Sequence, residues 1–164
     1  MAGPLNADTF HVARSIAIDA PPQVVFPYID DFHAWEAWSP YEKMDANLAK
    51  TYSGPPRGKG AAYAWVGKKA GSGRMEILQS DAPSKIVIQL DFTKPMTAHN
   101  TAEFTLEPRG GGTEVTWAMH GPNTFMSKVM GLFFSMDKLV GPQFEEGLAN
   151  LKRLAEEKAG AVSA

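Results

Sequence analysis

The stretch KIVIQLDFTKPMTAHNTAEFTLEPRGGGTEVTWAMH, residues 85–120, decides the fold. Apolar and polar side chains alternate along it in three runs, which is typical of half-buried strands. We therefore predict strands over Lys85–Phe92, Thr97–Leu106 and Thr113–His120. The breaks between them contain a proline or three consecutive glycines, which supply the backbone angles of hairpin turns. Neighbouring strands should consequently pair in an antiparallel meander.

The same alternation extends the sheet toward the N-terminus. Further strands are predicted over Phe10–Ile18, Asn47–Tyr52, Ala61–Val66 and Gly73–Gln79. Between the first two of these we expect a short helix over Gln23–Ile29, because prolines precede it and apolar side chains follow at helical spacing. A second helical turn should carry Trp35 and Trp38, which we expect to pin this segment to the sheet.

The last part of the chain is predicted to form a long helix. Apolar side chains recur at three- and four-residue spacings from Val129 to Leu154, with charged side chains off that stripe. Gly141-Pro142 interrupts the pattern and removes a backbone donor, so we predict a kink or a break into two helices there. The order of strand, two short helices, several strands and long helix indicates the α+β class.

Composition and charge limit the classes of function. The chain has 164 residues, a net charge of −2 and no cysteine. We expect one domain over residues 10–158, with short tails over residues 1–9 and 159–164. The near-neutral charge argues against nucleic acid as a partner, and the apolar stretch Phe125–Val140 is too interrupted for a membrane span. Because no signal peptide pattern is present, we expect a cytoplasmic protein; its oligomeric state stays open.

Several short motifs occur in an order that resembles one superfamily. They are IAIDAP at 16–21, WEAWSP at 35–40, GSGRMEI at 71–77, GTEVTW at 112–117 and GLANLK at 147–152. Their order and spacing are similar to those of the START/SRPBCC superfamily, within it the polyketide cyclase/dehydrase-like branch. The resemblance implies a helix-grip fold, in which a curved antiparallel sheet of about six to seven strands grips the C-terminal helix around a cavity.

Alternation along the strands also predicts which side chains face that cavity. Asn100 is the main neutral polar residue that the alternation places in the cavity. A buried amide without a partner costs about 1–3 kcal/mol, so Asn100 should form a hydrogen bond either within the protein or with a ligand. The candidate ligand-binding residues are Tyr63, Trp65, Met75, Ile77, Ile88, Leu90, Phe92, Asn100, Phe104, Trp117 and Met119 on the strands, and Met126, Val129, Met130 and Phe133 on the helix. The alternative for each apolar side chain is plain core packing between helix and sheet.

No motif indicates a catalytic or metal site. His11, His33, His99 and His120 are scattered without the spacing of metal ligands, so we interpret them as surface or hydrogen-bonded residues and expect neither a metal nor a cofactor. The two aspartates just before His33 could do acid–base work beside an imidazole. Helix-end residues in water are the favoured interpretation of that group.

Three functions stay open. The apolar inner face favours binding of a small hydrophobic, aromatic or lipid-like molecule in the cavity. The resemblance also implies a cyclase/dehydrase-like enzyme, in which Asn100, Tyr63 and Arg14 would orient a polyketone. The third is a protein-interaction module related to chaperone activators. The catalytic residues of any enzyme of this kind are unknown from the sequence.

Overall fold

The computed structural model describes residues 9–43, 48–68, 71–94, 97–122 and 136–163. Its centre is a seven-stranded antiparallel sheet with the order β1-β7-β6-β5-β4-β3-β2. The strands are β1 (Thr9–Ile18), β2 (Ala49–Ser53), β3 (Ala62–Val66), β4 (Ser72–Asp81), β5 (Lys85–Lys94), β6 (Ala98–Arg109) and β7 (Gly112–Pro122). Consecutive strands from β2 to β7 pair with one another, as the turn chemistry predicts, and β1 closes the sheet against β7.

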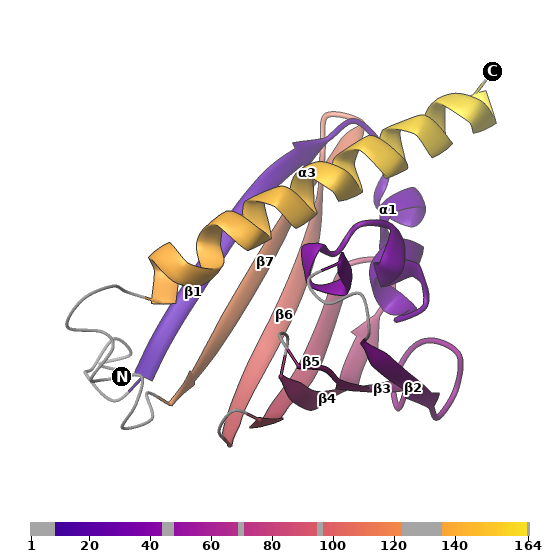
Figure 1. Ribbon diagram of the computed structural model, residues 1–164. Coiled ribbons are helices and arrows are strands. Elements are labelled where there is room, and N and C mark those ends of the chain that lie inside the picture. The colour runs from indigo at the N-terminus through magenta and orange to yellow at the C-terminus, as the bar shows by residue number, and fades with distance from the viewer. Residues whose placement is uncertain (1–8, 44–47, 69–70, 95–96, 123–135, 164) are drawn as a thin grey trace.

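Helices cover one face of this sheet. Helix α1 (Pro22–Asp30) and the 3₁₀ turns η1 (Ala34–Ala37) and η2 (Pro40–Lys43) follow β1, and helix α3 (Met136–Ser163) follows the last strand. Helix α3 crosses the curved sheet and packs along β1, while α1 and the two short turns lie beside it over the sheet (Figure 1). This arrangement confirms the predicted helix-grip fold.

Helix α3 differs from the prediction at its middle and at its end. It runs unbroken through Pro142, so of the kink or break predicted at Gly141-Pro142 the break does not occur. Pro142 is exposed and removes only the hydrogen bond to the carbonyl of Lys138, while Phe144 in the next turn is buried. The helix also continues to Ser163, past the expected end of the domain at residue 158.

The N-terminal tail and the predicted start of the long helix fall largely outside the described residues. Of the expected tail over residues 1–9, only Thr9 is described, and it belongs to β1. The proposed helical wall from Met126 to Phe133 lies outside the described residues altogether. Within the described parts of the chain, no helix is long and apolar enough to span a membrane.

The two short 3₁₀ turns are fixed by tryptophans, as the sequence predicts. The indole Nε1 of Trp35 donates to the carbonyl of Ile29 at 2.8 Å, and Nε1 of Trp38 donates to the carbonyl of Tyr28 at 2.8 Å. Both rings are buried. From the other side, Asn150 of α3 donates through Nδ2 to the carbonyl of Trp38 at 3.1 Å. The segment that follows Trp38 is therefore held between α1 and α3.

Candidate ligand cavity

The space between the sheet, η2 and α3 contains a partly enclosed cavity of about 300 Å³, called the main cavity below. It opens within the hydrophobic core, where large side chains do not fill the space between helix and sheet. Its lining residues are Trp35, Ser39, Tyr41, Leu48, Tyr63, Trp65, Met75, Leu90, Phe92, Asn100, Ala102, Trp117, Met119, Val140 and Phe144. A volume of this size is at the lower end of the range for small-molecule sites.

Eight of the candidate residues from the sequence line the main cavity. They are Tyr63, Trp65, Met75, Leu90, Phe92, Asn100, Trp117 and Met119. Ile77, Ile88 and Phe104 point to the same face but lie in solid core with 0% exposure, away from the cavity lining. Phe104, for example, is enclosed by the rings of Trp35 and Trp117, with ring centroids 5.7 Å and 5.0 Å away.

The remaining lining residues come from segments that strand alternation does not describe. Ser39 and Tyr41 lie at η2, and Leu48 directly precedes β2. Val140 and Phe144 belong to the apolar stripe of α3, but they lie 7 and 11 positions after Phe133, the last residue proposed for the helical wall. The spacing of Val140 and Phe144 at i and i+4 could have identified them. A single 3₁₀ turn is too short to show a repeat from which its inward-facing residues could be predicted.

Aromatic rings form most of the cavity wall. Trp117 of β7 stacks on Phe144 of α3 with a centroid separation of 4.0 Å and an interplanar angle of 8°. On the same inner face, toward the other edge of the sheet, Tyr63 stacks on Trp65 with ring centroids 5.9 Å apart. Trp65 in turn meets Phe92 edge to face at 5.7 Å. Offset and edge-to-face ring contacts of this kind add to the energy of burial of the rings.

Four neutral polar side chains, Ser39, Tyr41, Tyr63 and Asn100, interrupt this apolar wall. Asn100 is 6% exposed and Ser39 is 2% exposed, and neither side chain makes a hydrogen bond within the described part of the chain. Burial raises the pKa of the Tyr41 phenol above its ordinary value, so this group is neutral at physiological pH. Among the described lining residues there is no Lys, Arg, His, Asp or Glu. The cavity therefore offers hydrogen bonds without offering a charge.

Arg14 lies apart from this cavity, contrary to its proposed role in orienting a substrate. Its side chain points to the helix side of β1, but it packs against Gly141, and its Nε donates to Glu145 Oε2 of α3 at 2.7 Å. A second bond joins its Nη1 to the carbonyl of Ala13 at 2.8 Å. Arg14 is therefore part of the contact between β1 and α3.

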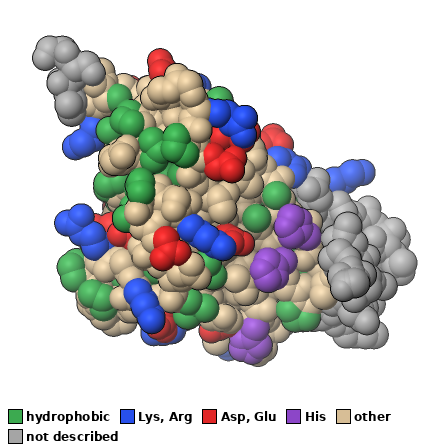
Figure 2. Space-filling model, turned by 180° about the vertical axis from the view of Figure 1, so that it is seen from behind, with side chains coloured by type: hydrophobic (Ala, Val, Ile, Leu, Met, Phe, Trp, Pro, Cys, Tyr) green, Lys and Arg blue, Asp and Glu red, His purple; other side chains and the backbone are tan. Residues whose placement is uncertain are grey.

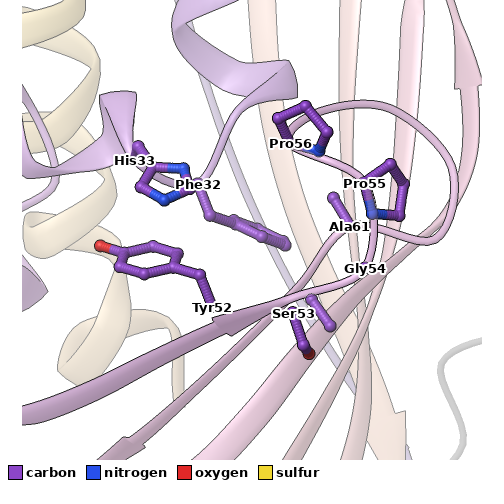
Figure 3. Close-up of a pocket in the computed structure, with 9 residues that line it drawn as sticks. Phe32, His33, Tyr52, Ser53, Gly54, Pro55, Pro56 and Ala61 are labelled. Atoms are coloured by element: carbon purple, nitrogen blue, oxygen red, sulfur yellow. The ribbon is translucent and has the colours of Figure 1, made fainter.

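A second hollow, of about 270 Å³, is lined by His33, Tyr52, Ser53 and the Pro55-Pro56 loop (Figure 3). His33 stacks on Tyr52 with centroids 3.8 Å apart, and its Nδ1 lies 3.0 Å from Oδ1 of Asp31. The hydroxyl of Ser53 points away from His33 (Figure 3). A serine nucleophile needs its hydroxyl directed toward the base, within hydrogen-bond reach. The Ser53 hydroxyl is not directed toward His33 of the exposed Asp31–His33 pair in this way.

A third hollow, of about 450 Å³, lies on the outer face of the sheet and is lined in part by His11, His99 and His120. Figure 2 shows histidine side chains gathered on this face. His11 and His120 are cross-strand partners, and Nδ1 of His99 lies 2.8 Å from Oδ1 of Asp91. Among the residues that the structure describes, no group of three or more His, Cys, Asp or Glu is placed to hold a metal ion.

Comparison with known families identifies the fold by sequence as well. Residues 9–156 match the family described as polyketide cyclase / dehydrase and lipid transport. The chain belongs to this family. The match begins with β1 and ends within α3, so it spans all of the described residues that line the main cavity. No curated protein sequence is significantly similar to the chain.

Solved structures of family-like fold are similar over nearly the whole chain. A protein from Thermobifida fusca aligns with a TM-score of 0.68 at 20% identity, covering 90% of this chain and 93% of that one. The Aha1 dimer from Colwellia psychrerythraea aligns with a TM-score of 0.60 at 16% identity, covering 90% and 96%. DynU16, a putative protein in the dynemicin biosynthetic locus, aligns with a TM-score of 0.61 at 15% identity, covering 91% of this chain and 48% of that one. At these identities the likeness shows the fold alone.

Proposed function

We propose that the protein binds a small, mainly apolar molecule with aromatic or lipid-like character in the main cavity. The observation that carries this proposal is a space of about 300 Å³ inside the core, walled by aromatic and aliphatic side chains. Burying such side chains around an empty space forfeits the dispersion contacts that a filled core would make. A bound apolar molecule would restore those contacts and would be stabilised by its own removal from water.

The family description supports the same proposal. Its name joins polyketide cyclases and dehydrases with lipid transport, two activities on largely apolar molecules. DynU16, which shares the fold, is encoded in the dynemicin biosynthetic locus. Neither relationship names the ligand of this chain. The aromatic walls of the main cavity favour a ligand with flat rings over a flexible chain of the same size.

A cyclase/dehydrase-like reaction is the alternative in the same cavity. Asn100 and Tyr63 both line it, as that hypothesis requires, and Arg14 does not. Aldol chemistry needs a base to remove a proton and a donor or cation to stabilise the enolate. The described lining residues include hydrogen-bond donors but no carboxylate, imidazole or amine. For this reason we place binding before catalysis.

An interaction role related to chaperone activators finds less support on the surface. Such a role would be favoured by a contiguous exposed apolar patch. Among the described residues, the exposed large hydrophobic side chains are Val66, at 62%, and Leu78, at 43%, on different strands. Single exposed apolar side chains of this kind are ordinary for a protein surface.

Filling the main cavity tests the proposal. Ala102 lies on β6 at the cavity wall, and Ala102→Phe would place a phenyl ring in the space of about 300 Å³. We expect wild-type protein to bind the neutral fluorescent probe N-phenyl-naphthylamine saturably. A102F should bind the probe at least about tenfold more weakly, which corresponds to a loss of roughly 1.4 kcal/mol of binding free energy. A fluorescence titration measures both affinities.

The matched control adds the same ring elsewhere on the sheet. Ala17 is exposed on the outer face of β1, so Ala17→Phe should leave the probe affinity unchanged. Circular dichroism and an unfolding curve establish that both variants keep the fold. The proposal fails if the wild type shows no saturable binding, or if A102F binds the probe as tightly as A17F.

A further inference from the structure

Ser39 is placed in the wall of the main cavity by a rigid local structure. Its own N–H donates to the carbonyl of Trp35 at 2.8 Å. The residue before it, Trp38, is fixed at both its indole nitrogen and its carbonyl, and Pro40 follows with a restricted backbone. The backbone of Ser39 is therefore fixed, and its inaccessible Oγ would have to turn about the Cα–Cβ bond to meet a ligand in the cavity.

Among the residues that the structure describes, the hydroxyl of Ser39 has no hydrogen-bond partner, although the residue is 2% exposed. A serine just before a helical turn commonly caps that turn by accepting a bond from one of its first N–H groups. Here the Oγ makes no such bond, so capping does not account for it. A buried polar group without a partner is destabilising by about 1–3 kcal/mol, and buried polar groups in proteins are paired in the great majority.

The neighbouring polar groups have the same character. The phenol of Tyr41 and the amide of Asn100 line the same cavity, and both are neutral. All three groups can donate a hydrogen bond, and all three can accept one. Among the described lining residues no side chain carries a charge that could neutralise an ionised ligand. Burying a carboxylate or an ammonium group there would be costly, because no charged side chain among the described lining residues compensates for the lost water.

We infer that the ligand is an uncharged molecule with an apolar, ring-bearing body and a carbonyl or hydroxyl group that hydrogen-bonds to the Oγ of Ser39. This inference rests on the proposed function and narrows it to neutral ketones, alcohols, phenols and esters. Fatty acids and other anions are disfavoured. The hydroxyl that is unpaired in the free protein gains its partner only when such a ligand is bound.

Three naphthalenes, each substituted at the same ring carbon, distinguish the effects of a neutral hydrogen-bond acceptor, of shape alone and of charge. Acetylnaphthalene carries a neutral acceptor, isopropylnaphthalene has the same shape without a polar atom, and naphthoate carries a charge. We expect Ser39→Ala to lower the affinity for acetylnaphthalene by about threefold to tenfold, the effect of one neutral hydrogen bond, and to leave the affinity for isopropylnaphthalene unchanged. Isothermal titration calorimetry measures each affinity in the wild type and in the variant.

Charge discrimination is measured in the same way. Naphthoate should bind the wild type at least about tenfold more weakly than acetylnaphthalene at neutral pH. Its binding should tighten as the pH falls and the carboxylate takes up a proton. Ser53, an exposed serine at another hollow, supplies the control, and Ser53→Ala should change none of the three affinities.

The possible results distinguish this inference from the proposed function. If isopropylnaphthalene binds but Ser39→Ala weakens both neutral ligands equally or neither, the hydrogen bond to Ser39 does not exist and the inference is overturned. Naphthoate binding as tightly as acetylnaphthalene overturns the selection of uncharged ligands. If none of the three compounds binds the wild type, the proposed function itself fails.

Discussion

Gly73 of β4 lies directly beneath the indole ring of Trp65, one wall of the main cavity. A methyl group added to Gly73 would lie 2.8 Å from Cη2 of that ring and would also collide with the backbone carbonyl of Asp91. Glycine is thus required here by close packing, and its backbone angles are ordinary. The space beside Gly73 is occupied by Trp65 and is not open to a ligand.

Gly73→Ala is expected to destabilise the protein by about 1–3 kcal/mol, the usual effect of overpacking a filled core. The variant should also shift the tryptophan fluorescence, because Trp65 must move. Gly160 in α3 provides the control, since a methyl group there meets nothing within 4 Å. Gly160→Ala should stabilise the helix by about 0.5–1 kcal/mol. Urea unfolding curves give both values, and a stabilised Gly73→Ala variant would contradict the packing argument.

The sequence predicted the sheet side of the cavity better than the helix side. Strand alternation places a side chain on one face or the other, so Tyr63, Trp65 and Asn100 could be assigned to the cavity. Alternation does not show which inward-facing side chains reach the cavity and which are covered by others. Phe104 was therefore predicted to line the cavity, although the rings of Trp35 and Trp117 enclose it. Ser39 could not be found, because its position depends on contacts with α1 and α3 that no local pattern encodes.

At the scale of elements, Pro142 shows why a local rule can fail. Proline disfavours a helix interior, and a kink or a break was the expected result. The flanking residues Val140 and Phe144 both face the main cavity, and their packing against the sheet rewards one continuous helix. Tertiary contacts of this kind commonly outweigh intrinsic helix propensity. The order of the elements was predictable, and the continuity of α3 was not.

The C-terminal half of α3 is attached to the end of β1 by a small group of polar side chains. Glu156 Oε2 accepts a hydrogen bond from the backbone N–H of Asp19 at 2.7 Å and another from Lys152. Lys152 Nζ also donates to the carbonyl of Ala17 at 3.1 Å. The bond from Lys152 and the bond from Asp19 hold the pKa of Glu156 below its ordinary value.

This lowered pKa predicts an acid-sensitive contact. Because the carboxylate has a lower pKa in the folded than in the unfolded protein, its stabilising effect is complete above the ordinary glutamate pKa of 4.5 and is lost as the pH falls through the folded value. Glu156→Gln should lower the free energy of unfolding at neutral pH by about 0.2–1 kcal/mol, as for exposed ion pairs. The difference between wild type and variant should shrink in acid.

Urea unfolding at a series of pH values measures this difference. The adjacent Glu157 is exposed and provides the matched control, so Glu157→Gln should follow the pH profile of the wild type. A gap between wild type and Glu156→Gln that stays constant from neutral to acid pH would show that the contact does not depend on the carboxylate charge.

For the whole molecule, the main cavity represents a compromise between stability and binding. A compact core of this size would be more stable if the cavity were filled and its polar groups were replaced by apolar ones. The polar side chains at Ser39 and Asn100 instead stay without partners in the described part of the chain. Proteins sit only slightly above the stability that they need, so a site of this kind is sustainable when the rest of the core is well packed.

Two asparagines test this compromise, because the same substitution should have opposite effects on them. Asn100 lines the main cavity and its side chain makes no hydrogen bond within the described residues, whereas Asn150 donates to the carbonyl of Trp38 at 3.1 Å. Asn100→Leu should raise the stability of the ligand-free protein by up to about 1 kcal/mol, since it replaces an amide of the cavity wall that makes no hydrogen bond within the described residues by an apolar side chain. Asn150→Leu should lower stability by about 1 kcal/mol, since it leaves a buried carbonyl unpaired.

Thermal unfolding with and without acetylnaphthalene measures both effects. For a chain of this length, 1 kcal/mol corresponds to a shift in Tm of about 2–4 °C, so the two variants should move in opposite directions by measurable amounts. A ligand that binds only the folded state raises Tm further. Asn100→Leu should receive a smaller increase from the ligand than the wild type, because one hydrogen-bonding group of the cavity is gone. If Asn100→Leu is instead less stable than the wild type without ligand, Asn100 stabilises the fold itself. The proposed compromise between stability and binding in the cavity is then wrong.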